Sequence, residues 1–461
     1  MPKVPFKLNV ERLKPNRHIE SITCVKLLRV IPDSRHVYDA LWNQKNVIVK
    51  IFSHKINAKR HLNREYNGLK KLQSRNLNVP QPLFVGQTCQ NDWAVITEKI
   101  ANGVTTLDIF NGTDEKQKRF ELLSQVCKEL AAQHERGVLQ KDLHLDNFIL
   151  LEDKVFTIDP AQIQFFNKPI CRKKSISQLA LLLLYWPQED NDTILKLAGQ
   201  YASVRKWQLQ DSDYIFLQKQ LIIQRKKIIR RGLKKYLRTS KRTLKVKSPE
   251  FTTVFKKDFC LQIQPLDFIN QIDFLMDKGH ILKRGNTSYV SKVTLNGKDI
   301  VIKRYNYKGI IHSLRHTIKR SRARRGWLLT NRLQMLNIPS PKPFAFIERR
   351  KFKIIWKSYI INEYLEGQNL YDLIHDDHVT EGNKVDILSE VQKLIEKLYQ
   401  YDISHGDLKM TNIIVTDKGP TFLDLDAMRV HISRLLLKLQ KNKDISRLKR
   451  NIPEFLLDKI E

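Results

Sequence analysis

The sequence repeats one polar pattern in its two halves, and this repeat is the feature that most constrains the fold. In each half an Asp is followed five residues later by an Asn, and another Asp follows twelve residues after that Asn. The two sets are Asp142, Asn147 and Asp159, and Asp407, Asn412 and Asp424. Because three polar residues recur at matching intervals in similar apolar surroundings, the 461-residue chain is expected to be a duplication of two related units.

The repeat extends upstream of these segments. Lys50 and Lys303 each stand in a short β-branched run of the kind typical of a strand. A helical stretch, a Pro-containing turn and a second strand-like run follow each Lys before the polar segment begins. Each half is therefore expected to contain strands, a helix, further strands and then helices around a polar loop. We expect a first domain at residues 1–217, a basic helical linker at 218–250 and a second domain at 251–461.

The charge of the chain indicates an anionic partner. Lys and Arg number 82 against 48 Asp and Glu, which gives a net charge of +34 and a pI near 9.9. Such a surplus favours a nucleic acid, a phospholipid surface or a phosphorylated substrate. The five cysteines are scattered without a CxxC pair, which argues against a disulfide framework or a structural zinc site and fits a reducing compartment.

The apolar residues of the chain indicate no membrane-spanning helix. The longest apolar run, Leu179–Trp186, is well short of the roughly 18–20 residues that a transmembrane helix needs. Residues 1–17 contain no apolar core of a secretory signal, so none is expected.

One segment between the halves is basic throughout. Residues 219–247 hold thirteen Lys or Arg and no Asp or Glu, and the centre of this run has apolar residues at roughly helical spacing. The run is expected to form a basic helix. Two interpretations remain open for it, a solvated helix face or a surface for anionic lipid or another polyanion.

The repeated residues are the types that phosphoryl transfer requires. A Lys holds the nucleotide phosphates, a carboxylate orients that Lys, an Asp accepts the proton of the acceptor hydroxyl, and an Asn and a further Asp hold magnesium. In the first half, Lys50 and Glu65 are the candidates for nucleotide binding and Asp142 is the candidate base. Asn147 and Asp159 are the candidate metal ligands.

The second half supplies the same types in the same order. Lys303 is the candidate for nucleotide binding, Asp407 for the base, and Asn412 and Asp424 for metal binding. A lone Lys at a strand end is usually a surface residue, and an Asp in a loop often forms a turn. Repetition of the whole set weighs against both interpretations. Asp426 is either a further metal ligand or a loop cap, and we favour the cap.

Two motifs in the second half resemble those of the protein-kinase-like superfamily. They are His405–Asn412 (HGDLKMTN) and Phe422–Asp426 (FLDLD). Within that superfamily, residues 321–327 and 337–343, with their Arg and Pro pattern, make the chain look most like the lipopolysaccharide core kinases, which phosphorylate heptose or Kdo sugars. The resemblance covers most of both halves.

The resemblance implies a fold and an activity. Each half would be an α+β protein-kinase-like bilobal domain, with a small β-rich N-lobe, a mainly helical C-lobe, and ATP and Mg²⁺ between them. The chain would be an ATP-dependent kinase acting on a sugar hydroxyl of the lipopolysaccharide core or another phosphorylated glycolipid. It would work on the inner face of the cytoplasmic membrane of a Gram-negative bacterium, held by its basic patches. Asp444 would brace the catalytic loop, as the corresponding kinase residue does.

Departures from the kinase pattern leave open which half is catalytic. Gln140 stands in the first half where the second half has His405, and neither half carries a GxGxxG nucleotide loop. No acid occurs between residues 299 and 348, so Lys303 has no counterpart of Glu65 in the sequence.

Two other functions stay in view. One or both halves could be a pseudokinase that acts as a scaffold, as the Gly-poor loops suggest. The chain could also be an atypical protein kinase or an RNA-associated kinase. A nucleic-acid partner is not favoured, because the sequence contains no aromatic-interleaved RNA-binding motif.

Overall fold

The structure is a computed structural model, and it describes residues 4–12, 18–31, 35–52, 57–188, 190–285, 288–306, 320–454 and 456. The chain divides into two compact units, residues 1–226 and 227–461, and each unit has its own sheet and core. Parts of both expected nucleotide loops, at 32–34 and 286–287, and the basic residues at 315–319 lie outside the described residues.

The N-terminal lobe of the first unit is a six-stranded antiparallel sheet. Its strands have the order β1-β2-β3-β4-β6-β5. They are β1 (Phe6–Arg12), β2 (His18–Ile31), β3 (Arg35–Trp42), β4 (Lys45–Phe52), β5 (Pro82–Gln87) and β6 (Trp93–Glu98). Helix α1 (Ala58–Gln73) packs on this sheet. Leu62, Glu65, Leu69 and Leu72 recur on its buried side at spacings of three and four, so α1 carries Glu65 into the interior.

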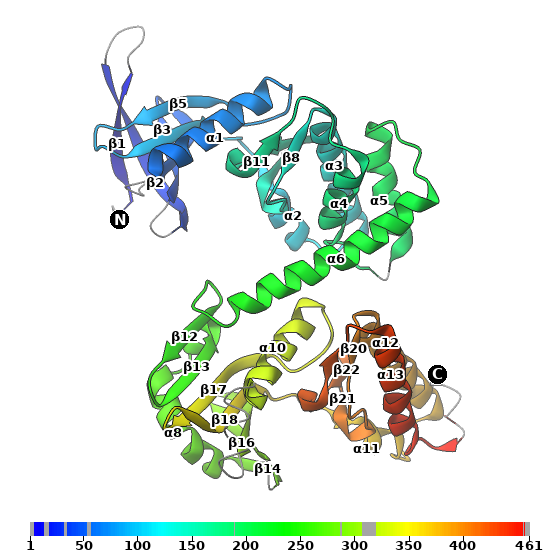
Figure 1. Ribbon diagram of the computed structural model, residues 1–461. Helices are drawn as coiled ribbons and strands as arrows, with labels where there is room; N and C mark the ends of the chain where they lie inside the picture. Colours follow the sequence, from blue (N-terminus) through cyan, green and yellow to red (C-terminus); the bar gives the residue numbers. More distant parts are fainter. Residues whose placement is uncertain are drawn as a thin grey trace. The chain divides into compact units, whose positions relative to one another are not determined.

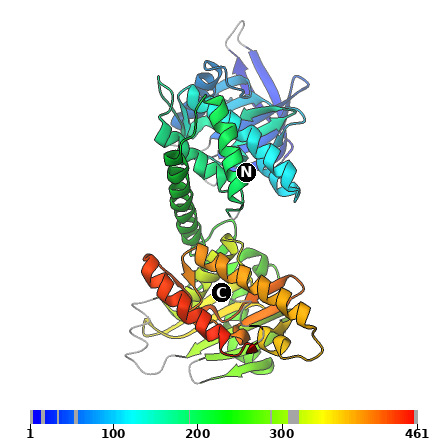
Figure 2. The same cartoon turned by 90° about the vertical axis from the view of Figure 1, so that its right-hand side faces the viewer.

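The C-terminal lobe of the first unit is mainly helical, and Figures 1 and 2 show its cyan-to-green helices beside the blue strands of the sheet. Short strands and 3₁₀ turns carry the polar loop. The elements are β7 (Val104–Thr105), α2 (Thr106–Gly112), α3 (Lys116–Glu135), β8 (Val138–Gln140), η1 (Leu145–Asn147), β9 (Phe148–Leu151), β10 (Lys154–Thr157), η2 (Pro160–Gln162), β11 (Ile163–Phe165), α4 (Arg172–Leu183) and α5 (Asn191–Val204). Strand β8 pairs with β11, and β9 pairs with β10 and β7, so the polar loop is held at both ends.

The second unit repeats this plan with a larger sheet. Its strands have the order β12-β13-β17-β18-β16-β15-β14. They are β12 (Thr243–Lys247), β13 (Phe251–Lys256), β14 (His280–Arg284), β15 (Ser288–Leu295), β16 (Lys298–Asn306), β17 (Pro343–Lys351) and β18 (Ile354–Glu363). Helix α10 (Arg322–Met335) packs on β17 and β18, and α7 (Lys257–Cys260) and α8 (Pro265–Lys278) lie on the same unit. The N-lobe of the second domain therefore contains more than the single helix that we expected.

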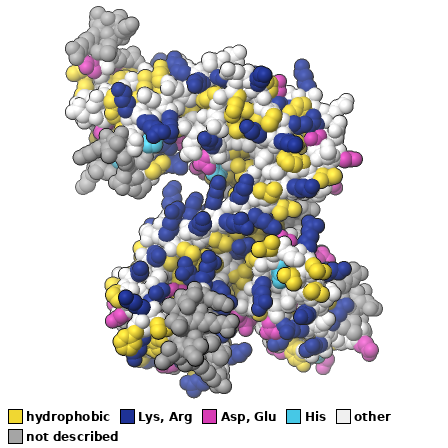
Figure 3. Space-filling model, viewed as in Figure 1, with side chains coloured by type: hydrophobic (Ala, Val, Ile, Leu, Met, Phe, Trp, Pro, Cys, Tyr) yellow, Lys and Arg dark blue, Asp and Glu magenta, His cyan; other side chains and the backbone are white. Residues whose placement is uncertain are grey.

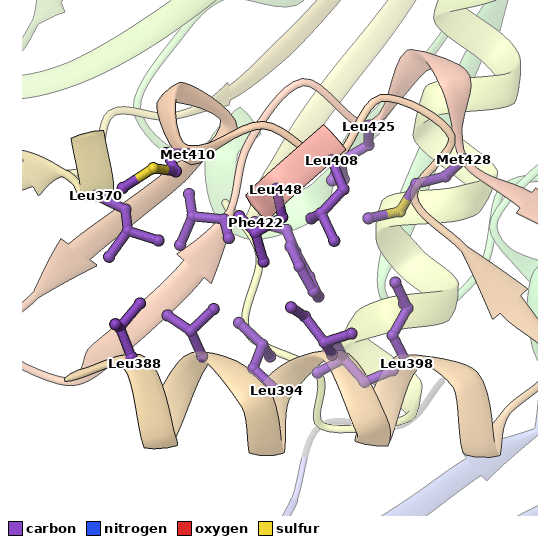
Figure 4. Packing of buried hydrophobic residues seen from close by; sticks show 14 of the residues in the cluster. Leu370, Leu388, Leu394, Leu398, Leu408, Met410, Phe422, Leu425, Met428 and Leu448 are labelled. Carbon is purple, nitrogen blue, oxygen red and sulfur yellow. The ribbon is translucent and has the colours of Figure 1, made fainter. Parts of the chain in front are cut away.

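The C-terminal lobe of the second unit surrounds a core of leucines. Its elements are β19 (Gln368–Asn369), α11 (Leu370–Ile374), α12 (Glu381–Gln400), β20 (Ile403–Ser404), η3 (Met410–Asn412), β21 (Ile413–Thr416), β22 (Gly419–Phe422), η4 (Leu425–Ala427), β23 (Arg429–Val430) and α13 (Arg434–Lys449). Figure 4 shows Leu388, Leu394 and Leu398 of α12 on one side of this core, with Leu370, Leu408 and Phe422 on the other side. Each buried Leu stabilises the lobe by about 1.5–3 kcal/mol, and together these leucines hold the polar segment against α12.

The basic segment between the halves forms a helix and a strand. Helix α6 (Asp211–Lys235) contains the first part of the segment that we expected as a linker, and β12 contains part of the remainder. The border between the two compact units falls inside α6, after Lys226. No helix in the described part of the chain combines the length and apolar character needed to cross a bilayer.

Candidate active sites

The structure brings Asp142, Asn147 and Asp159 of the first domain together around one loop. Asn147 donates from its side-chain Nδ2 to the backbone oxygen of Asp142 at 2.7 Å. The backbone N–H of Ile158 donates to the backbone oxygen of Asn147 at 2.9 Å. Asp159 follows in a left-handed conformation, with φ of 56°. These contacts tie the candidate base, amide and carboxylate into one unit.

The second domain builds the same arrangement from Asp407, Asn412 and Asp424. Asn412 donates from Nδ2 to the backbone oxygen of Asp407 at 2.8 Å. The N–H of Leu423 donates to the backbone oxygen of Asn412 at 2.8 Å, and Asp424 has φ of 45°. The two loops therefore share their hydrogen bonds as well as their spacing, although their sequences differ at most positions.

Lys50 of the first domain lies between two carboxylates. Its Nζ forms ion pairs with Glu65 of α1 and with Asp159. Burial alone would lower the pKa of Lys50, but these two carboxylates outweigh it and raise that pKa. Helix α1 reaches the loop because Gly68 lies against Pro160, where an added Cβ would sit 2.8 Å from the proline Cβ. The sequence-predicted pair of Lys50 and Glu65 is thus assembled beside the candidate metal ligand.

Two arginines that the sequence analysis did not single out also reach Asp159. Arg35 of β3 lies 3.3 Å from Asp159 and 3.7 Å from Glu65, and Arg29 of β2 lies 3.5 Å from Asp159. Burial alone would raise the pKa of Asp159, but Lys50 and Arg35 hold it well below its usual range. Asp159 therefore faces three cations. Arg29 comes just before residues 31–36, the segment without Gly that stands where a kinase has its nucleotide loop, and Arg35 lies within it; that position is the sequence signal that pointed to them.

Lys303 of the second domain has a different set of partners. Its Nζ lies 2.6 Å from Asp424 and 2.8 Å from Asp426, both in the loop after β22. Asp426 also accepts hydrogen bonds from Arg322 at 3.0 Å and from Tyr305. Our expectation that Asp426 caps the loop is wrong, because the 3₁₀ turn η4 directs its side chain to Lys303.

Asp426 provides the second carboxylate that Glu65 provides in the first domain. Helix α10 has Gly326 on its buried side, where an added Cβ would lie 2.9 Å from the Cδ1 of Ile360. The helix packs so closely on β18 that an acidic side chain has no space there. The absence of an acid from this helix, noted in the sequence, is thus matched by a carboxylate from η4, which contacts the same helix.

The candidate catalytic loop of the second domain is braced by helix α13. Asp444 is fully buried and accepts from the N–H of His405 at 2.9 Å and from the N–H of Gly406 at 3.0 Å. His405 donates from Nε2 to the backbone oxygen of Leu423 at 3.1 Å, and its burial lowers its pKa. His405 is therefore a neutral structural residue, and the expected brace by Asp444 is present.

Cations surround the candidate base of the second domain. Lys409 lies 3.2 Å from the Asp407 carboxylate, and Arg447 lies 3.6 Å from it and also donates to the backbone oxygen of Gly406. Arg447 was missed from the sequence, although it lies one helical turn beyond Asp444. In the first domain the neighbour of Asp142 is His144, at 2.9 Å, and no Arg or Lys ion pair with Asp142 occurs in the described residues.

The candidate metal ligands suit magnesium bound together with ATP. No cluster of three or more His, Cys, Asp or Glu side chains that would hold a metal by itself occurs in the described ranges. Mg²⁺ in kinase sites takes one or two protein carboxylates, and phosphate and water oxygens fill its remaining positions. Asn412 uses its amide N–H for Asp407, which leaves its amide oxygen free to join Asp424 as a ligand.

A series of hydrogen-bonded polar side chains lies in the interior next to the polar loop of the first domain. Gln140 donates to Gln133 at 2.8 Å, and Gln133 donates to Glu129 at 2.9 Å and to Thr157 at 2.7 Å. Burial raises the pKa of Glu129 from an ordinary value of 4.5 to about 7. The folded state therefore keeps a proton on Glu129 between these two values, where the unfolded chain has lost it.

The first domain is expected to lose stability as the pH rises from about 4.5 to 7 because of Glu129. Glu129→Gln stays neutral and keeps the acceptor oxygen, so it should be more stable than the parent at pH 8 by about 2–3 kcal/mol and nearly equal at pH 5. Calorimetric unfolding of the full chain at both pH values measures this difference. Glu121→Gln, an exposed acid on the same helix, is the control and should change little at either pH. An unchanged pH dependence in Glu129→Gln would contradict the assignment.

The fold and the two loops define a class of protein: two tandem protein-kinase-like domains in one chain, each with a β-rich N-lobe and a helical C-lobe. Comparisons with known families agree with this class. Residues 276–458 match the lipopolysaccharide kinase (Kdo/WaaP) family, and residues 44–172 match the RIO domain. The chain is also 26% identical over 170 residues to the EKC/KEOPS complex subunit BUD32 of Enterocytozoon bieneusi (strain H348), across 34% of this chain and 73% of that protein.

The chain therefore consists of two tandem kinase-like domains. More particularly, its second domain matches the lipopolysaccharide kinase family and its first domain matches the RIO domain, and both of these are kinase families. The protein is an ATP-dependent kinase.

Proposed function

We propose that the chain transfers the γ-phosphoryl group of ATP to a sugar hydroxyl of a phosphorylated glycolipid, such as a heptose or Kdo of the lipopolysaccharide inner core. The match of residues 276–458 to the lipopolysaccharide kinase family carries this proposal. The net charge of +34 supports it, since such an acceptor bears phosphates and carboxylates.

The second domain is the proposed centre of the transfer. Among the described residues, Asp424 forms an ion pair with Lys303 alone. Asp159 forms ion pairs with three cations, so less of its carboxylate is available to bind a metal ion. Lys409 adds a permanent positive charge beside Asp407. The first domain would then be a kinase-like binding module, or a weaker second centre.

The reaction follows from the proposed roles of the side chains. Asp407 accepts the proton of the acceptor hydroxyl while the hydroxyl oxygen bonds to the γ-phosphorus and the bond from that phosphorus to the leaving oxygen of ADP breaks. Lys303 binds the phosphates, and Lys409 stabilises the charge on the transferred group. Magnesium, when bound by Asn412 and Asp424, neutralises the charge that develops on the phosphate oxygens.

Activity at an anionic membrane surface is part of the proposal. Each Lys or Arg close to such a surface contributes about 1 kcal/mol, so the basic segment 219–247 supplies enough attraction without an anchor. Sedimentation with anionic vesicles at low salt, and release at high salt, tests this part. A chain that stays in the supernatant at low salt would rule it out.

A second candidate function is phosphorylation of protein. The match of residues 44–172 to the RIO domain and the likeness to the BUD32 subunit favour it. An assay with γ-labelled ATP and two acceptors, a delipidated core oligosaccharide and dephosphorylated casein, separates the two functions. We expect label in the oligosaccharide, and mass spectrometry would then identify the sugar. Label in the protein acceptor alone would overturn the glycolipid proposal and support the second candidate.

A further inference from the structure

A pocket of the second unit lies beside its candidate active site. It has a volume of about 440 Å³ and is formed by the C-terminal part of α6, by α10 and by the segment from η4 to β23. Figure 3 shows Lys and Arg side chains gathered over the C-terminal part of α6. Apart from Gly326 and Asp426, the residues that line the pocket form a basic group and an apolar group, and nothing in the proposed transfer uses either group.

The basic group is large and has few partners. Its members are Arg230, Lys234, Arg320, Arg325 and Arg332. Within the described ranges none of these five side chains pairs with a carboxylate. The acid in the lining, Asp426, is already engaged by Lys303 and Arg322. The pocket therefore presents an uncompensated positive charge.

The charges in the pocket oppose one another. Arg332 is partly buried, and burial together with the neighbouring Arg230 lowers its pKa. Two guanidinium groups held together without an anion are mutually destabilising, because a like charge nearby disfavours the charged form. A phosphate placed between them would remove this repulsion and accept charge-assisted hydrogen bonds from both.

The remainder of the lining is apolar. Its members are Leu233, Leu237, Leu328, Leu329, Leu425, Met428 and Val430. A free phosphate is hydrated on every side and gains nothing from a leucine wall, whereas an apolar chain attached to the phosphate is driven out of water by about 25 cal/mol for each Å² that it buries. The combined lining fits a molecule with an anionic head and an apolar tail.

The pocket is separate from the place of phosphoryl transfer. Neither Lys303, Asp407 nor Asn412 lines it, and it meets the transfer site only through Asp426. Its occupant is therefore neither the ATP phosphates nor the acceptor hydroxyl.

We propose that this pocket is a binding site for a lipid with an anionic phosphate head group, with the phosphate held by Arg230, Arg325 and Arg332 and the apolar chain lying on the leucines of α6 and α10. The lipid holds the second domain to its membrane surface and does not react there. The proposal does not depend on which sugar or protein the kinase phosphorylates.

Calorimetric titration of the full chain tests the site. Both nucleotide sites are first saturated with Mg²⁺ and a non-hydrolysable ATP analogue, so that phosphate groups cannot bind there. The probe is dihexanoyl phosphatidic acid below its micelle concentration. We expect one strong site for it, and at least tenfold weaker binding of dihexanoyl phosphatidylcholine and of inorganic phosphate.

Variants separate the pocket from general attraction to a basic chain. Arg230→Gln changes an exposed side chain and should weaken the binding of phosphatidic acid. The double variant, with both Arg230→Gln and Arg332→Gln, should weaken this binding by at least tenfold. Lys235→Gln, an exposed cation of the same helix outside the pocket, should bind within twofold of the parent.

Three results would overturn the proposal. Inorganic phosphate that binds as tightly as the lipid would mean a free-phosphate site. Equal binding of the choline lipid, whose head group has no net charge, would mean that the positive charge of the pocket does not select an anionic head group. A loss in Lys235→Gln as large as in the arginine variants would mean diffuse attraction to positive charge. A failure of the transfer assay would leave these binding results untouched, so the two proposals are tested separately.

Discussion

Asp407→Asn is expected to lower the kcat for phosphotransfer by about 100- to 10,000-fold, the range typical of a lost general base. Asn has the size of Asp but cannot accept the proton of the acceptor hydroxyl. The affinity for ATP should stay close to that of the parent, because the Lys303 cluster with Asp424 and Asp426 is intact. Initial rates with γ-labelled ATP and core oligosaccharide, together with the Kd of an ATP analogue, measure both quantities.

The matching variant in the first domain separates the two centres. Asp142→Asn should change the rate by less than about threefold, because we assign the transfer to the second domain. Asp417→Asn, an exposed acid of the hairpin that follows Asn412, is the control for a lost charge and should behave as the parent. Loss of activity in Asp142→Asn alone would move the centre to the first domain. Full activity in both variants would remove both loops from the reaction.

The sequence predicted the loops of the sites because their residues are close together along the chain. Asp407 and Asn412 are five residues apart, and a short loop of that length must bring their groups near one another. The strand pairing of β21 with β22 then returns the chain to Asp424. The short spacing along the chain predicted the grouping of Asp142, Asn147 and Asp159 in the same way, and the structure also places these residues around one loop.

The partners of the lysines were harder to predict because they depend on distant elements. Glu65 was found since it falls on the buried side of a helix with clear periodicity. Asp426 was assigned to a cap, because its contact with Lys303 depends on the left-handed turn at Asp424, and neither the turn nor its direction is visible in the spacing. Arg35 reaches Asp159 across 124 residues of sequence, through the pairing of β3 with β4.

The extent of the second sheet also exceeded the prediction. Residues 243–247 were part of the expected basic linker, since their Lys residues raise the charge of that run. The structure pairs them with β13 as the edge strand β12, in which half-buried Leu244 and Val246 alternate with exposed Lys245 and Lys247. Charged residues are common on edge strands, where they oppose aggregation, so a basic composition did not exclude a strand. The pocket beside α10 was likewise invisible, because it joins three segments that are distant in sequence.

Asp444→Ala is expected to destabilise the second domain by about 3 kcal/mol and to lower the rate of transfer. Asp444 is fully buried and accepts the N–H groups of His405 and Gly406. Each buried donor that loses its acceptor costs about 1–3 kcal/mol, and the unfolding midpoint of a domain of this size falls by roughly 2–4 °C for each kcal/mol. Calorimetric unfolding of the full chain measures the stability change. Asp386→Ala, an exposed acid on α12, is the control and should stay within about 0.5 kcal/mol of the parent.

The kinetic effect of the same change tests whether Asp444 positions the catalytic loop. Gly406 has φ of 81°, and an added Cβ there would lie 2.4 Å from the backbone oxygen of Ala427, so the loop is held closely between α13 and the segment of Asp426. A loop that shifts by about 1 Å misplaces Asp407 and can cost about 100-fold in rate. We therefore expect kcat to fall at least tenfold in Asp444→Ala at temperatures where the domain is folded, with the Kd of an ATP analogue nearly unchanged. Asp444→Asn, which keeps one acceptor oxygen, should recover part of both losses. A variant that is less stable but keeps the kcat of the parent would show that Asp444 supports the fold of the domain and not the position of its base.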